Sequence, residues 1–172
     1  MAQIDSYVKF EGSELNGDST DSEHANEIEI TSWVQGITQT KSATVSSAGG
    51  HTAERADIGE LIFTKHIDKA SPRIHRACAA GTVYSKMTVK SYRSMGGQNS
   101  TSGKSRINYL TWVCDNVLIS SSEIAVKEGA LAEHTFACKF SKFTVEYKQQ
   151  KIDGSSASTG IVGWDAAKNT IV

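Results

Sequence analysis

Apolar residues recur at every second position along most of this chain, and a single proline is present in the whole sequence. In the first such segment Ile4, Val8 and Phe10 fall on one face, while Asp5 and Lys9 fall on the other. Because successive side chains of a β-strand point to opposite sides, this period of two predicts a half-buried strand. The sequence therefore predicts a mainly β domain.

Six principal strands are predicted from the same pattern, each bounded by clusters of Gly, Ser or Asn. Their ranges are 4–10, 27–37, 56–66, 82–93, 106–121 and 133–149, with a short last strand at 161–164. In the fourth strand the expected inward side chains are Val83, Met87 and Val89. In the run 133–149 the alternation changes phase near Ser141 and Lys142, which predicts a β-bulge there.

The segment 71–80 departs from the strand pattern and is predicted to be a short helix. Ser71 is the expected N-cap, Pro72 occupies the first helical position, and Gly81 ends the helix. The helix face expected to pack on the sheet carries Ile74, Ala77 and Cys78. The fold class predicted is therefore a β domain with one short helix on its side.

The charge of the chain argues against two classes of partner. Its 172 residues carry 18 Lys and Arg against 19 Asp and Glu, a formal net charge of -1. A nearly neutral chain offers no long-range attraction to phosphate backbones or to anionic lipids. We therefore expect one ordinary domain covering residues 1–172, with no nucleic-acid or membrane partner.

The N-terminus and the cysteines bear on where the protein is made. Residues 1–10 show no basic stretch followed by an apolar run, and no segment approaches the ~20 apolar residues that span a bilayer. The three cysteines form no C-x-x-C pair, which suits buried thiols in a reducing compartment. These features predict synthesis in the cytoplasm without a signal peptide.

Motifs that would carry chemistry are weak or absent in this sequence. The stretch 97–105 resembles a phosphate-binding loop, but five residues instead of four separate its glycines and a strand is expected to follow. No G-x-S-x-G occurs, and the five histidines lack metal-ligand spacing. The acidic residues Asp18, Asp21, Glu23 and Glu27 lack calcium-loop spacing and are expected to form a solvated loop. We therefore expect no catalytic site, metal or cofactor.

Two features instead favour assembly. The strand 106–121 is apolar on both faces, so a barrel interior can cover one face while the helix or a neighbouring subunit covers the other. The stretch 41–55 is rich in small residues and is too long for an idle hairpin. Structureless loops of about 12 to 15 residues in a compact domain are usually functional or disordered.

Several segments together resemble the Hcp family, the haemolysin co-regulated proteins of type VI secretion. The loop motif 41–44 and 49–55 is the most specific part, followed by Phe63-Thr64-Lys65 and by 68–72. The resemblance continues through Cys78, Gly81, 109–121, the strand around Glu146 and the closing Gly163-Trp164, so it covers essentially the whole chain.

This resemblance implies a β-barrel with one flanking helix, assembled as a homohexameric ring that catalyses nothing. Stacked rings would form the secreted inner tube of the type VI secretion system. A contractile sheath would propel the tube, a VgrG-type spike would cap its tip, and small effector proteins would ride in its lumen. Such proteins leave the cell through their own machine, which agrees with the expected lack of a signal peptide.

The resemblance also implies roles for particular residues. Ser32 and Val34 would face the lumen, with Trp33 in the core, although a register slip of one residue would invert that facing. The loop 41–55 would project from one ring and contact the next ring. Its contact candidates are Lys41, Ser42, Ala43, Thr44, Ser46, Ser47, Gly49, Gly50, His51, Thr52, Glu54 and Arg55.

Two other functions are compatible with the pattern. A tail-tube protein of a phage or another contractile particle would share the architecture, but should lack the Gly-Gly-His-Thr-Ala-Glu-Arg loop at 49–55. A hydrolase would need Ser, His and Asp side chains that only folding brings together.

Overall fold

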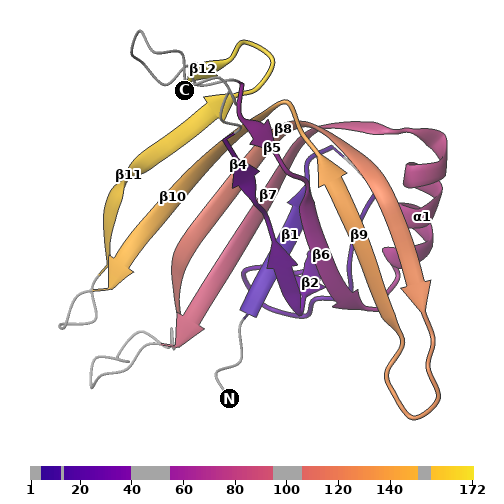
Figure 1. The fold of residues 1–172 in the computed structure, drawn as a ribbon. Helices are drawn as coiled ribbons and strands as arrows, with labels where there is room; N and C mark the ends of the chain where they lie inside the picture. Colours follow the sequence, from indigo (N-terminus) through magenta and orange to yellow (C-terminus); the bar gives the residue numbers. More distant parts are fainter. Residues whose placement is uncertain (1–4, 13, 40–54, 95–105, 151–155) are drawn as a thin grey trace, which may run out of the picture.

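The computed structural model describes residues 5–12, 14–39, 55–94, 106–150 and 156–172, and these form a mainly β fold with one short helix, as predicted (Figure 1). The helix is α1 Ser71–Ala80. The strands are β1 Asp5–Phe10, β2 Ile28–Ile30, β3 Ser32–Val34, β4 Ile37–Thr38, β5 Asp57–Ile58, β6 Leu61–His66, β7 Val83–Ser94, β8 Arg106–Ala125, β9 Glu133–Lys139, β10 Lys142–Gln150, β11 Ser156–Asp165 and β12 Thr170–Ile171.

The long strand β8 organises the sheet. Its residues Leu110 to Asp115 pair with β10, and its residues Leu118 to Ala125 pair with β9. Between these halves Asn116 has a φ of 53°, a left-handed conformation that Asn tolerates better than most residues. The predicted phase change near residues 141 and 142 is therefore real, but the predicted bulge is wrong. Lys139 pairs with Leu118 and Lys142 pairs with Asp115, so the same number of residues separates the two pairs on each side and no extra residue is inserted.

The strand ladders follow three paths away from β8, one of which runs through β10 and β11 to β12. The other two lead toward β2 and β3. One runs through β7 and β1 to β2, and the other runs through β9 and β6 to β3. In the described residues no ladder joins β2 to β3, so the ladder pattern is open at this point. Thr31 lies between these strands and donates its backbone N–H to the carbonyl of Thr64 over 2.9 Å. One continuous stretch of chain thus leaves the β1 side of the sheet and joins the β6 side.

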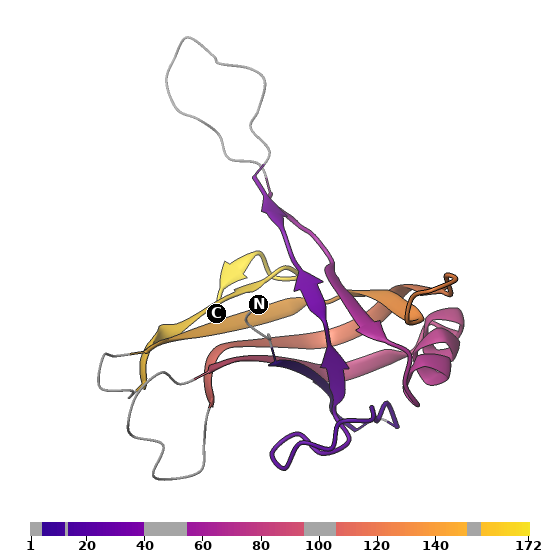
Figure 2. The same cartoon turned by 90° about the horizontal axis from the view of Figure 1, so that it is seen from below.

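Besides the run 133–149, which forms β9 and β10, two other predicted strands are divided in the structure. The predicted strand 27–37 becomes β2, β3 and β4, and the predicted strand 56–66 becomes β5 and β6. β4 and β5 pair only with each other and stand away from the rest of the molecule as a two-stranded ribbon (Figure 2). At the root of this ribbon, Gly59 donates its N–H to the carbonyl of Gly36 over 2.8 Å.

The helix lies where it was predicted, but its first turn is capped differently. Ala70 occupies the N-cap position, and Ser71 is buried inside the first turn. The free N–H groups of Ala70 and Ser71 donate instead to Oδ1 of Asp68, over 2.9 and 3.1 Å. At the other end Gly81 has a φ of 64°, which confirms the predicted glycine C-cap. The helix packs its buried Ile74 and Ala77 against β8.

The core is formed by inward-facing side chains of most strands of the sheet together with Ile74 and Ala77 of α1. Phe63 and Phe136 stack with ring centroids 5.0 Å apart, and Trp112 stacks on Phe143 at 5.3 Å. All three cysteines are free, with Cys114 and Cys138 buried and Cys78 half-buried. The predicted inward set of β7 is correct for Met87 and Val89 but wrong for Val83. Val83 begins β7 beyond the cover of the core and is 61% exposed.

Candidate functional site

Strand β3 presents its predicted residues on two different faces. Trp33 points inward, donating from Nε1 to the Ser91 hydroxyl over 3.2 Å and meeting the ring of Trp112 edge-on at 5.9 Å. Ser32 is exposed and Val34 is 59% exposed. Because neighbours on a strand alternate, Ser32 and Val34 share the face opposite the core.

Strands β6 and β9 extend this outer face. Ser32 lies opposite Thr64 and Val34 lies opposite Ile62 in the register of β3 with β6. On β9, Thr135 and Ala137 continue the same two rows. We call this surface the β3–β6–β9 face. It is formed by Ser32, Val34, Ile62, Thr64, Thr135 and Ala137, of which Ala137 is buried. The ionisable side chains of His66 and Glu133 border it on β6 and β9.

The β4–β5 ribbon carries the predicted inter-ring loop. Residues 41–54 of that loop lie outside the described residues, so the contact candidates among them stay a prediction. Arg55 is described, and it turns onto its own chain by donating from Nη2 to the carbonyl of Ala166. The ribbon itself has only two register pairs, Ile37 with Ile58 and Thr38 with Asp57.

Exposed apolar side chains occur at two opposite ends of the molecule. At one end, Ile161 and Val162 on β11 are 65% and 67% exposed, on both faces of the strand. At the other end, Val126 and Leu131 in the turn between β8 and β9 are 78% and 75% exposed. Figures 1 and 2 place β11 at the left and the β8–β9 turn beside α1 at the right.

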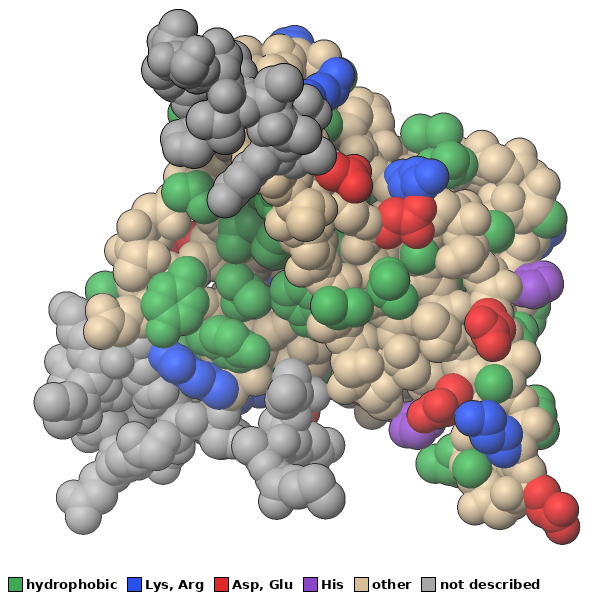
Figure 3. Space-filling view, viewed as in Figure 1, with side chains coloured by type: hydrophobic (Ala, Val, Ile, Leu, Met, Phe, Trp, Pro, Cys, Tyr) green, Lys and Arg blue, Asp and Glu red, His purple; other side chains and the backbone are tan. Residues whose placement is uncertain are grey.

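The space-filling view shows apolar side chains near the end of the molecule where β11 lies. Figure 3 shows hydrophobic side chains gathered in a band across the face in view, reaching the side where β10 and β11 lie. β12 pairs with β11 only at Trp164 and Asp165. The rest of β11 therefore offers an open sheet edge flanked by apolar side chains, the kind of edge that natural proteins usually cover.

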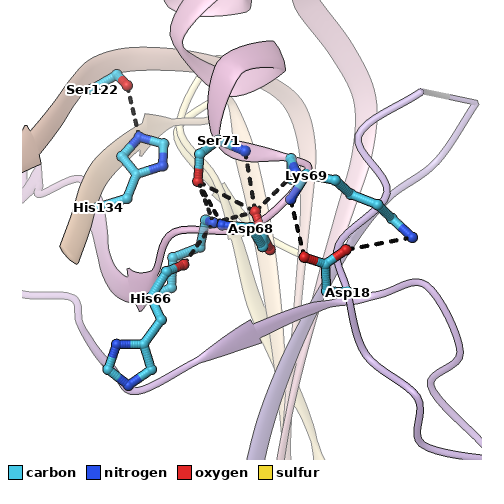
Figure 4. Close-up of polar contacts among 9 residues, drawn as sticks. Asp18, His66, Asp68, Lys69, Ser71, Ser122 and His134 are labelled. Atoms are coloured by element: carbon cyan, nitrogen blue, oxygen red, sulfur yellow. Dashed lines mark hydrogen bonds and ion pairs between the residues drawn. The ribbon is translucent and has the colours of Figure 1, made fainter. Parts of the chain in front are cut away.

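A buried polar cluster joins β6 to the start of α1 (Figure 4). Lys65 is fully buried, and its Nζ donates to Asp68 Oδ1 at 2.5 Å, to Ser71 Oγ at 2.8 Å and to the His66 carbonyl at 3.1 Å. Burial lowers the pKa of Lys65, and the hydrogen-bonded Asp68 carboxylate opposes this shift. The cluster fixes the first turn of the helix and leaves no donor of Lys65 unused.

The structure also contains the Ser–His contact that a hydrolase would need. His134 Nε2 lies 2.8 Å from Ser122 Oγ, as Figure 4 shows, and Ser122 Oγ also lies 3.0 Å from His75 Nδ1. The buried Nδ1 of His134 has no hydrogen-bond partner, so no carboxylate orients the ring. Burial, together with the charge of Lys65, lowers the pKa of His134 to about 4. The imidazole of His134 binds a proton weakly and has no carboxylate to orient it, so it is a poor general base.

The acidic loop is less solvated than the sequence predicts. Arg106 Nη2 contacts Asp21 at 2.5 Å, and its guanidinium lies 4.8 Å from the centroid of the Tyr92 ring. His24 is buried and bridges Glu27, at 2.7 Å, to the Tyr92 hydroxyl, at 2.6 Å. Asp18 is 59% exposed, as expected, but Asp21 and Glu27 are partly buried structural partners. The expectation of a solvated loop is thus wrong for these two carboxylates.

The described residues show no other grouping with a chemical purpose. Among them, no group of three or more His, Cys, Asp or Glu side chains could hold a metal ion. In the same part of the chain, no helix has both the length and the apolar character that a membrane crossing needs. Burial raises the pKa of Cys114 to about 12, which keeps this thiol unreactive.

A β-rich domain with exposed apolar side chains at two opposite ends and a projecting ribbon defines the class of protein: a structural subunit that assembles with others. Comparison with known proteins identifies the family. The family model described as "Type VI secretion system effector, Hcp" matches residues 7–147. The chain belongs to the Hcp family of type VI secretion, whose members are secreted structural tube proteins and not enzymes.

Individual relatives agree with this assignment over nearly the full length of the chain. Protein hcp1 of Pseudomonas aeruginosa is 31% identical over 171 residues, which cover 96% of this chain and 97% of that protein. A solved type six secretion system protein has a TM-score of 0.85 at 22% identity, covering 98% of this chain and 99% of the other. Hcp1 from Salmonella typhimurium gives a TM-score of 0.72 at 22% identity, with the same coverage.

Proposed function

We propose that this chain, as one domain over residues 1–172, is the subunit of the inner tube of a type VI secretion system. Six copies form a ring in which the sheet of each copy acts as a β-barrel, and rings stack into a tube. The observation that carries the proposal is the pair of apolar ends on opposite sides of the molecule. A heterologous contact between such ends, repeated around an axis, forms a ring when the rotation from copy to copy closes.

The two ends are suited to this contact. Ile161 and Val162 flank an open edge on β11, while Val126 and Leu131 extend beyond α1 at the far side. Burying such side chains contributes about 1.5 to 3 kcal/mol each. Joining the two ends between neighbours also covers the β11 edge, which would otherwise promote unordered association.

The β3–β6–β9 face is the proposed lumen wall. It contains Ser32 and Val34, the two residues that the family resemblance assigns to the lumen. Its other four members are the uncharged residues Ile62, Thr64, Thr135 and Ala137. A wall made mainly of hydroxyl and aliphatic groups, with His66 and Glu133 at its border, holds a small effector protein by many weak contacts. This surface therefore suits a cargo that is retained during assembly and later released.

The β4–β5 ribbon is the proposed contact between stacked rings. It leaves the sheet in one direction (Figure 2), and in the sequence the predicted inter-ring loop lies between β4 and β5. In the assembled machine we place a VgrG-type spike at the tube tip and a contractile sheath around the tube. The protein is then made in the cytoplasm and exported by the type VI system itself.

The ring proposal is tested at the β11 edge. The double variant Ile161→Glu/Val162→Glu places charges on both faces of the open strand, so purified protein should lose the ring and become monomeric. Lys9→Glu is the matched control, because Lys9 is exposed on β1, away from β11, and its substitution changes the net charge by the same two units. Mass by light scattering is the measurement. Intact rings in the double variant would contradict the proposed contact.

A further inference from the structure

We propose that Arg55 is a positioning residue: by binding the carbonyl of Ala166, it fixes the direction in which the β4–β5 ribbon leaves the sheet. The inference rests on the proposed function, since the direction matters only if the ribbon contacts the next ring. The sequence alone groups Arg55 with the residues that touch that ring. Its guanidinium is instead bound to its own subunit, at the turn between β11 and β12.

The ribbon cannot hold its own direction. β4 and β5 have two residues each, and their two register pairs join them only to each other. An isolated two-stranded hairpin is marginally stable even when it is longer than this. The orientation of the ribbon must therefore come from contacts between its root and the sheet.

The apolar contacts at the root do not set a direction. Ile37 and Ile58 line a groove with Phe143 and Trp164, and Ile58 packs against the edge of the core. Apolar contact is non-directional, so it allows the ribbon to tilt within the groove. Arg55 also lines this groove and adds the directional contact, because a planar guanidinium donates along fixed N–H directions.

The acceptor is held firmly enough to serve as an anchor. Ala166 donates its own N–H to the Ser141 carbonyl over 2.8 Å, and Ser141 donates its N–H to the Asp115 carbonyl over 3.1 Å. Asp115 belongs to β8, the longest strand of the sheet. In the same turn, Asp165 Oδ1 accepts the N–H of Lys168 over 2.9 Å. A series of main-chain hydrogen bonds thus connects the acceptor of Arg55 to the centre of the sheet.

The first test measures the ribbon within single rings. A nitroxide on Asp57→Cys, in a Cys78→Ser background, reports the motion of β5 through its line shape. Arg55→Ala should make the label more mobile, and Arg55→Lys should restore restriction in part, because one donor can still reach the carbonyl. Arg76→Ala is the matched control, since it removes the same charge from an exposed position on α1. An unchanged line shape in Arg55→Ala would overturn the proposal.

The second test measures stacking, and it separates this inference from the proposed function. Arg55→Ala should raise the protein concentration for half-maximal stacking by about tenfold, the loss expected for one hydrogen bond to a charged group. The mass of the ring and its melting temperature should not change in Arg55→Ala. Dissociation of the ring or a lower melting temperature would overturn a positioning role. A mobilised label with unchanged stacking would support the Arg55 contact but refute the proposed role of the ribbon between rings.

Discussion

The indole of Trp33 donates a hydrogen bond to the Ser91 hydroxyl across 3.2 Å, and this contact holds the indole on the inner face of β3. Ser91 Oγ also lies 2.9 Å from Ser6 Oγ, so the indole is tied to both β7 and β1. A shift of one residue would turn Ser32 inward and break this contact. The orientation of the proposed lumen wall is therefore supported by this polar contact together with the packing of the indole against the core.

This relationship predicts opposite outcomes at neighbouring positions. Ser32→Glu should leave the ring and the free energy of unfolding unchanged while weakening retention of a small effector protein, because the charge enters the proposed lumen. Trp33→Ser should lower the free energy of unfolding by about 3 kcal/mol, since it leaves a large cavity. Urea unfolding and co-purification of effector measure the two effects. Loss of the ring in Ser32→Glu would show that the facing is inverted.

The root of the ribbon offers a matched pair of glycines. A Cβ on Gly59 would lie 2.7 Å from the Gly36 carbonyl oxygen, whereas a Cβ on Gly36 would meet nothing within 4 Å. Gly59→Ala should therefore force apart the hydrogen bond that closes the root and speed amide exchange in β4 and β5. Gly36→Ala should leave that exchange close to its original rate. Equal rates in both variants would contradict the close approach at Gly59.

His134 predicts a pH dependence of stability. Its pKa is about 4 in the folded protein because of burial, against an ordinary value of 6.5. Above pH 6.5 the His134 imidazole is neutral in both the folded and the unfolded protein, so its titration does not change the free energy of unfolding. As the pH falls from 6.5 to 4 the unfolded chain takes up the proton first, so the free energy of unfolding drops by up to about 3 kcal/mol.

Urea unfolding between pH 7.5 and pH 4.5 tests this prediction at a fixed protein concentration. The variant His134→Phe cannot be protonated, so its free energy of unfolding should fall less steeply than that of the original protein. Carboxylates titrate in both proteins, and the difference between the two curves isolates His134. Curves with the same slope would refute the assignment.

Replacing the buried Lys65 should lower the free energy of unfolding more than replacing an exposed lysine that is also paired with a carboxylate. Lys65→Met leaves the Asp68 carboxylate without its charged partner and should lower the free energy of unfolding by about 3 kcal/mol. Lys139 lies 3.3 Å from Glu60 but is 64% exposed, and Lys139→Met should change stability by less than about 0.5 kcal/mol. Thermal and urea unfolding measure both. Similar losses in the two variants would contradict a structural role for the buried cluster.

Local sequence signals predicted the elements well where a short-range pattern determines the structure. Alternation located the strands, and the Pro72 and Gly81 pair located α1. The N-cap was misassigned because Ser71 is drawn into the buried cluster by Lys65, a contact that no local pattern reveals. Asp68, three residues upstream, satisfies the helix N–H groups in its place.

The remaining differences arise from pairing between distant strands. The break at residues 140–141 was interpreted as a bulge because the sequence does not show that β8 changes partner at Asn116. Alternation predicts that Val83 shares the inward face of β7, but it does not show how far along the strand other side chains cover that face. The hydrogen bond from Arg55 to the Ala166 carbonyl could also not be predicted, since it joins positions 111 residues apart.

Whether this chain forms the tube subunit is decided by the mass of the purified protein in solution, measured by light scattering together with negative-stain images of the same sample. We expect rings of six with an open centre, at six times the subunit mass of 18.5 kDa. A monodisperse species of 18.5 kDa with no ring in the images would contradict it.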